Sequence, residues 1–167
     1  METGADSNNN DTLDDAEVTG TSYICNQMRV LEGDYTVNSQ EDLDGMVYTE
    51  ITGDVTIKAP DIENVDNFSS LVSIGGDLYI KSIDALTDID GLKGVSSVGG
   101  DLDIISNQTL AGITALKSLT LDGNYTVRDN TILPACQARS IADNLVNNPE
   151  YTWTITISGN DDTDTCP

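Results

Sequence analysis

The sequence predicts a mainly β protein: a right-handed parallel β-solenoid of about five to six coils of 20–24 residues, closed by a C-terminal helix and a final strand. Three observations predict it. A five-residue phrase recurs five times, its copies follow one another at 20, 23, 24 and 23 residues, and the apolar residues between them fall into columns. Such self-similarity is typical of repeat proteins, in which stacked units bury faces that no unit could bury alone.

The recurring phrase is Gly-Asp-apolar-polar-apolar, and it predicts the strands. Its copies begin at Gly33, Gly53, Gly76, Gly100 and Gly123, the last with Asn in place of Asp. Because side chains alternate along a strand, the third and fifth positions should point inward and the second and fourth toward solvent. We expect one such strand per coil, each about 4.8 Å from the next.

The segments between the phrases predict turns that direct an apolar side chain inward about every third residue. The columns are Leu43, Val65, Ile89 and Ile113; Met46, Phe68, Leu92 and Leu116; Leu71, Val95 and Leu119; and Ile51, Ile74 and Val98. A polar column of Gln40, Asn107 and Asn130 lies seven positions after the glycine, where an inward amide can bond the backbone of a turn. Pro60 and Ile83 interrupt it.

The two ends of the chain predict a tail and two caps. Residues 1–22 are polar and acidic and lack any cation, so we expect a flexible tail or linker. Residues 23–167 form one domain with an N-terminal cap at 23–32 and a C-terminal cap at 133–167. In the second cap a helix starts near Pro134, stops before Pro149 and is followed by the final strand. Its apolar face is expected to hold Cys136, Ile141, Ala142, Leu145 and Val146.

Three cysteines bear on the compartment. Cys136 and Cys166 flank the helix and strand of the C-terminal cap, which favours a disulfide between them and an oxidising environment. Cys25 is then either a free thiol or the partner of a group outside the chain.

Charge and composition exclude several functions. The chain carries 7 Lys+Arg, 29 Asp+Glu and no His, for a net charge of −22. This charge repels nucleic-acid phosphate and anionic lipid. Without an imidazole, His-dependent hydrolases and most zinc sites are excluded. No apolar run reaches the length of a membrane span, so we expect no direct membrane insertion. We also expect the protein to be a monomer.

The outward positions of the strands are the candidate ligand-binding surface, because packing already accounts for the inward ones. The candidates are Thr56, Lys58, Asp77, Tyr79, Lys81, Asp101, Asp103, Thr126 and Arg128. On this surface a row of acidic residues lies opposite a row of cations. The simplest explanation is that the cations reduce the repulsion among the acidic residues and keep the sheet soluble. A sharper alternative is calcium held by Asp54, Asp77 and Asp101, since that ion prefers hard oxygen ligands. The run from Asn160 to Asp164 resembles part of a calcium loop, but a polar terminal turn is the simpler interpretation.

The phrase Gly-Asp-Leu-x-Ile, the run from Leu102 to Leu110 and the Ser-Ile/Val-Gly-Gly turns resemble the leucine-rich, receptor L-domain-like repeats of secreted bacterial surface proteins. These are related to receptor L domains and fungal cell-wall proteins. The likeness runs from about Cys25 to Cys166, and Leu133-Pro134-Ala135-Cys136 is similar to the closing cap of the bacterial group. The resemblance implies an extracellular recognition module, often tethered by a lipid or linker.

We therefore expect a non-catalytic, cell-surface recognition or adhesion domain that needs no cofactor and binds a protein or glycan through its exposed parallel sheet. It would stand away from the surface on the N-terminal tail. Two alternatives stay open. One is a carbohydrate-active β-helix enzyme that works with carboxylates, and the other is a calcium-dependent structural surface protein.

Overall fold

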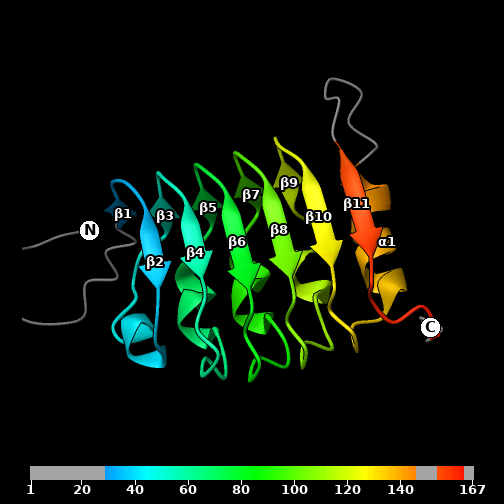
Figure 1. Ribbon diagram of the computed structural model, residues 1–167. Coiled ribbons are helices and arrows are strands. Elements are labelled where there is room, and N and C mark those ends of the chain that lie inside the picture. Colours follow the sequence, from blue (N-terminus) through cyan, green and yellow to red (C-terminus); the bar gives the residue numbers. More distant parts are fainter. Residues whose placement is uncertain (1–28, 146–153, 164–167) are drawn as a thin grey trace, which may run out of the picture.

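The computed structural model describes residues 29–145 and 154–163, and in them the protein is mainly β, with two parallel sheets and one short α-helix (Figure 1). Along residues 29–128 the chain visits the two sheets alternately, adding one strand to each in turn. The five-stranded sheet holds β1 (Val30–Leu31), β3 (Glu50–Ile51), β5 (Ser73–Ile74), β7 (Ser97–Val98) and β9 (Thr120–Leu121) in that order. The six-stranded sheet holds β2 (Tyr35–Val37), β4 (Val55–Ile57), β6 (Leu78–Lys81), β8 (Leu102–Ile105), β10 (Tyr125–Arg128) and β11 (Ile155–Ser158).

Each repeat thus contains two strands, whereas the sequence predicted one. The phrase forms the longer strand of the six-stranded sheet. The column of Ile51, Ile74 and Val98 forms a second, two-residue strand that pairs in register with its neighbours. So short a strand carries no readable alternation, which is why periodicity alone did not reveal it.

The register aligns equivalent positions of the phrase from repeat to repeat. Val55 pairs with Leu78, Leu78 with Leu102 and Leu102 with Tyr125, and all four side chains are 0% exposed. The inward fifth position is confirmed in all five copies, because Ile57 and its equivalents are buried as well, and the inward third position is confirmed in the last four; in the first copy Tyr35 is only half-buried.

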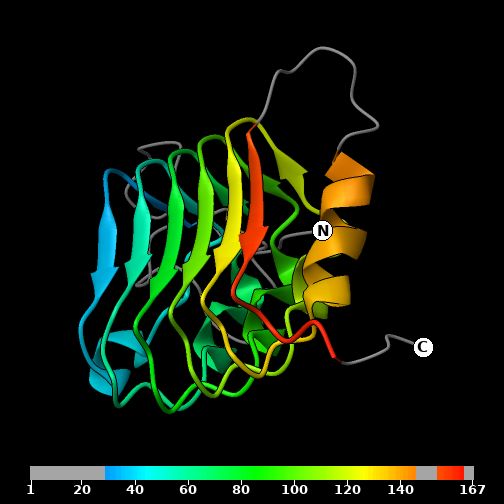
Figure 2. The same ribbon diagram turned by 45° about the vertical axis from the view of Figure 1, so that its right-hand side comes forward.

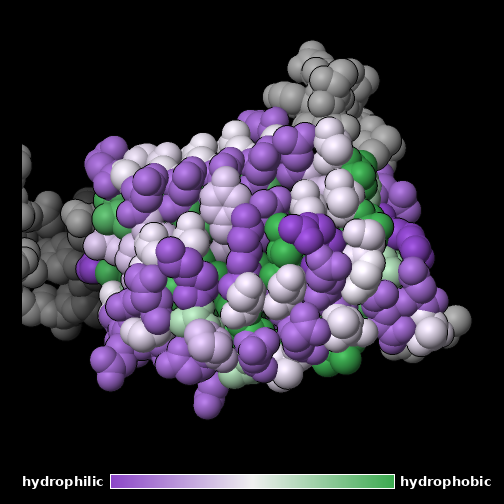
Figure 3. Space-filling model, viewed as in Figure 1, coloured by the Kyte–Doolittle hydropathy of each residue, from purple (hydrophilic) through white to green (hydrophobic). Residues whose placement is uncertain are grey.

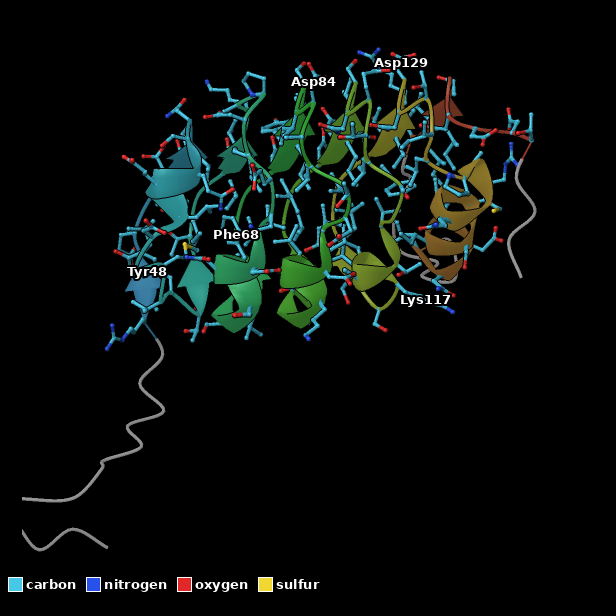
Figure 4. All side chains as sticks on the ribbon, turned by 90° about the horizontal axis from the view of Figure 1, so that it is seen from below. Tyr48, Phe68, Asp84, Lys117 and Asp129 are labelled. Carbon is cyan, nitrogen blue, oxygen red and sulfur yellow. The ribbon has the colours of Figure 1, made fainter. Side chains whose placement is uncertain are left out.

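The core lies between the two sheets and the short 3-10 helices that connect them. These helices are η1 (Gln40–Leu43), η2 (Asp66–Ser70), η3 (Asp90–Gly94) and η4 (Thr114–Leu116). Every member of the four predicted apolar columns is buried, with Met46 and Leu119 the most exposed at 7%. Phe68 of η2, which is labelled in Figure 4, is fully buried. Its ring meets that of Tyr35 of β2 edge to face, with ring centroids 6.3 Å apart. Aliphatic columns with a few rings therefore fill the interior.

At the C-terminal end of the stack, the helix α1 (Ala135–Leu145) packs behind β11 (Figure 2). The expected burial of Ile141, Ala142 and Leu145 is confirmed, and Ala138 joins them. Cys136 is half-buried and Val146 lies outside the described residues. The predicted tail at 1–22, most of the N-terminal cap and Trp153 of the final strand also lie outside them.

Candidate functional site

The outward face of the six-stranded sheet carries three rows of side chains that cross the strands. The residues just before the strands form the Asp row: Asp34, Asp54, Asp77, Asp101 and Asn124. The fourth phrase positions form the middle row: Thr36, Thr56, Tyr79, Asp103, Thr126 and, from β11, Thr156. Lys58, Lys81, Ile105 and Arg128 form the cation row, with Ile105 between Lys81 and Arg128. In Figure 3 this face is mostly hydrophilic, with small hydrophobic areas between.

The Asp row interlocks with the backbone of the next repeat. The Oδ1 atom of Asp54 accepts the backbone N–H of Asp77 at 2.9 Å, and Oδ1 of Asp77 accepts that of Asp101 at 2.7 Å. Asp34 and Asp101 act in the same way toward Asp54 and Asn124. Asn124 ends the series, because its own Oδ1 accepts the N–H of Thr154 at 3.0 Å. Each side chain therefore satisfies a backbone donor about 20 to 30 residues further on.

The same contact explains why glycine precedes every member of the row after Asp34; at Gly33, which precedes Asp34, the positive φ of 95° is the reason for a glycine. A Cβ atom at Gly76 would lie 2.1 Å from Oδ1 of Asp54, and one at Gly100 would lie 2.0 Å from Oδ1 of Asp77. Gly53 and Gly123 stand in the same relation to the preceding repeat. The two residues of the Gly-Asp pair therefore act together. The glycine leaves room for the carboxylate of the repeat before it, and the backbone N–H of the Asp donates to that carboxylate.

Tyr79 connects the Asp row with the cation row. Its hydroxyl donates to Oδ2 of Asp77, and the Nζ atom of Lys81 lies 4.0 Å from the centroid of its ring. The same Nζ lies 2.9 Å from Oδ2 of Asp103. The hydrogen bond to Asp77, and less so partial burial, raises the pKa of Tyr79. Four of the predicted surface residues are therefore brought together at the centre of the sheet.

The remaining predicted residues take no part in the side-chain contacts of this cluster. Arg128 pairs with Asp129, which follows it in the chain, at 2.5 Å. Lys58 is exposed and forms no ion pair within residues 29–145 and 154–163. Thr56 and Thr126 are half-buried in the middle row on either side of Tyr79 and Asp103.

On the inner side of the sheet, the predicted amide column is confirmed at Asn107 and Asn130 and is extended, whereas Gln40 is only half-buried and accepts the N–H of Glu63 at 3.0 Å. Asn107 and Asn130 are 0% exposed, and Oδ1 of Asn130 accepts the N–H of Asn107 at 2.9 Å. Oδ1 of Asn107 accepts the N–H of Ile83 at 3.0 Å, so the amide also serves the repeat that lacks one. Asn160 adds a member that sequence reasoning missed, because Asn130 donates to its Oδ1 at 3.1 Å.

Asn160 therefore belongs to this column, and the residues after it form a turn. The carboxylate of Asp161 accepts both the hydroxyl and the backbone N–H of Thr163, and these bonds lower the pKa of Asp161. Among the described residues, no three acidic or cysteine side chains are grouped so that they could hold a metal ion. Calcium binding by Asp54, Asp77 and Asp101 stays a prediction. A calcium ion bound there would share Oδ1 of each carboxylate with a backbone N–H.

Cys136, near the start of α1, is disulfide-bonded. Both Cys25 and Cys166 lie outside the described residues, so the pairing with Cys166 remains a prediction. Arg139 of the same helix pairs with Asp162 at 2.6 Å. The backbone N–H of Ala135 also donates to the carbonyl oxygen of Asp161 at 2.8 Å, which places the chain beside the start of α1 five residues before Cys166 and favours that pairing over one with Cys25.

Comparison with known proteins adds one match. The family described as Domain of unknown function (DUF7151) matches residues 1–25, a segment that ends before the described repeats begin. No curated protein matches the chain. Within the described part of the chain, no helix combines the length and the apolar character needed to cross a bilayer.

Proposed function

We propose that the protein is a non-catalytic recognition or adhesion domain that acts at the cell surface and binds a protein or glycan through the outward face of the six-stranded sheet. In this proposal the two sheets form a right-handed solenoid of five to six coils, which holds that face rigid. The acidic segment 1–22 links it to its surroundings. No cofactor takes part.

One observation carries the proposal: the middle and cation rows present side chains that neither the core nor the backbone requires. Thr56, Lys58 and Thr126 have no role in burying the apolar columns. The Tyr79–Lys81–Asp103 cluster also lies on the outward face of the sheet, away from these columns. The Asp row, in contrast, is already engaged by backbone donors. A surface assembled from in-register strands can display such groups at fixed spacing, which suits an extended ligand.

The test is a binding screen of the immobilised full chain against cell-surface glycans and proteins, followed by steric variants. Thr56→Trp and Thr126→Trp place bulk in the middle row. Ser73→Trp and Ser97→Trp place the same bulk on the five-stranded sheet, where both serines are half-buried on the outward side. We expect the first pair to abolish binding of the ligand found and the second to leave it within about twofold. Binding that only the serine variants abolish would place the site on the other sheet and contradict the proposal.

A further inference from the structure

Three of the seven cations of the protein lie in one row on the outward face of the six-stranded sheet. Lys58 directly follows β4 and Lys81 ends β6; because Ile57 of β4 pairs with Ile80 of β6, their backbones lie about 5 Å apart. Lys81 and Arg128 both pair with Ile105 and are thus two strand spacings apart, about 10 Å. In a chain of net charge −22, this row is a local concentration of positive charge.

The three cations are accessible to an external anion. Lys58 is exposed and has no ion-pair partner among the described residues. The pairs of Lys81 with Asp103 and of Arg128 with Asp129 are partly exposed, with side-chain exposures of 36% and 21%, and of 44% and 49%. Ion pairs in contact with water contribute little, so an incoming anion can compete for these cations.

The Asp row acts on the cation row only weakly. Along each strand the Asp row lies four residues before the cation row, which is about 13 Å. That distance exceeds the Debye length of about 8 Å at physiological ionic strength, so solvent ions screen the Asp row. The charges nearest to a ligand on the cation row are the cations themselves, the two acids that pair with them, and the exposed Asp61 and Asp84, which follow Lys58 and Lys81 by three residues.

The face suits a glycan better than a peptide. The strands β4, β6, β8 and β10 are paired on both sides, so their backbone groups are already bonded and a peptide cannot add as a further strand there. A peptide lying across them would bury amides with few partners. Sugar hydroxyls both donate and accept, and they match the Thr56 and Thr126 hydroxyls and the Asp103 carboxylate of the middle row.

We propose that the cation row and the middle row together bind an anionic glycan, carboxylated or sulfated, that lies across the strands of the six-stranded sheet. This inference rests on the proposed function and specifies its ligand class. Carboxylate or sulfate groups contact Lys58, Lys81 and Arg128, while the sugar hydroxyls contact the middle row.

The test measures binding of the full chain to four immobilised polymers at low salt: polygalacturonate, heparin, neutral dextran and poly-L-glutamate. We expect binding to one or both anionic glycans, none to dextran, and weakening as salt rises. Polygalacturonate and heparin distinguish a carboxylated from a sulfated ligand. The double variant Lys58→Gln/Arg128→Gln should weaken glycan binding at least tenfold.

The matched control is Lys93→Gln/Lys117→Gln, which changes the net charge equally. Lys93 belongs to η3, and Lys117 lies across the molecule from Asp129, the neighbour of Arg128 (Figure 4). We expect this control to bind within about twofold of the unaltered chain. Equal weakening by both double variants would show an effect of overall charge and overturn the inference.

Two further outcomes separate this inference from the proposed function. Tighter, row-dependent binding to poly-L-glutamate than to either glycan would assign the row to an acidic protein partner and overturn the glycan proposal. Binding to neither anionic glycan, while another ligand is still blocked by Thr56→Trp, would overturn the inference and leave the proposed function standing. Circular dichroism of each variant verifies that it is folded.

Discussion

The Asp row and the cation row lie on the same face of the same sheet, four residues apart on each strand, yet their surroundings differ. Asp54 and Asp77 each accept a backbone N–H of the next repeat, and a glycine makes room for each carboxylate. Lys58 forms no ion pair with any residue that the structure describes, and Lys81 and Arg128 pair with acids that are themselves in contact with solvent. A charged residue that recurs with a repeat can therefore be part of the scaffold, whereas a charged row free of the backbone is available to a ligand.

The largest effect is expected from a substitution that fills the space occupied by a carboxylate of the Asp row. Gly100→Ala would place a Cβ 2.0 Å from Oδ1 of Asp77, so the carboxylate or the backbone must move. We expect a loss of about 2–3 kcal/mol in the free energy of unfolding, the usual scale of overpacking.

Gly112→Ala is the matched control for Gly100→Ala, because its nearest neighbour would be Cβ of Asp88 at 3.8 Å. We expect this change to alter stability by less than about 1 kcal/mol. Urea denaturation of both variants gives the comparison. Similar losses for the two would mean that the space above Gly100 is not required.

A smaller effect separates the hydrogen bond of the Asp row from its charge. Asp101→Ala removes the acceptor for the Asn124 N–H, now 2.6 Å from Oδ1, and should cost about 1–2 kcal/mol. Asp101→Asn keeps an acceptor oxygen, as Asn124 itself does toward Thr154. We expect the amide variant to unfold within about 0.5 kcal/mol of the unaltered chain.

Urea denaturation of the two Asp101 variants also distinguishes the role of the hydrogen bond from that of the negative charge. A loss for Asp101→Asn as large as that for Asp101→Ala would mean that the negative charge, and not the acceptor, stabilises the row. Lys58→Ala provides the reference from the cation row, and its stability should be unchanged within the same margin.

The parts of the fold that follow from local periodicity could be predicted from the sequence. The phrase predicted five of the six strands of the six-stranded sheet, and the columns predicted the core, because both depend on regular spacing within a few residues. The five-stranded sheet was missed because its strands are only two residues long. Contacts between repeats, such as the Oδ1 atom of Asp77 above Gly100, depend on three-dimensional stacking and leave only a recurring dipeptide in the sequence.

The last repeat shows the same limit. Tyr125 pairs with Ile155, an offset of 30 residues, because α1 is inserted before β11. Asn160 therefore fell outside the regular spacing of about 23 residues, and its place in the amide column could not be predicted from it. On the outward face, the sequence predicted the rows, but the contact of Lys81 with both Tyr79 and Asp103 requires side-chain geometry.

Amide hydrogen exchange at Asp101 tests the central claim most directly, because its N–H donates to Oδ1 of Asp77 at 2.7 Å. In Asp77→Ala we predict that this amide exchanges at least tenfold faster, while amides within β6 and β8 keep their protection. In Lys58→Ala we predict no change at Asp101. Unchanged exchange at Asp101 in Asp77→Ala, or equal acceleration in both variants, would contradict the claim that the Asp row secures the backbone while the cation row is free to bind.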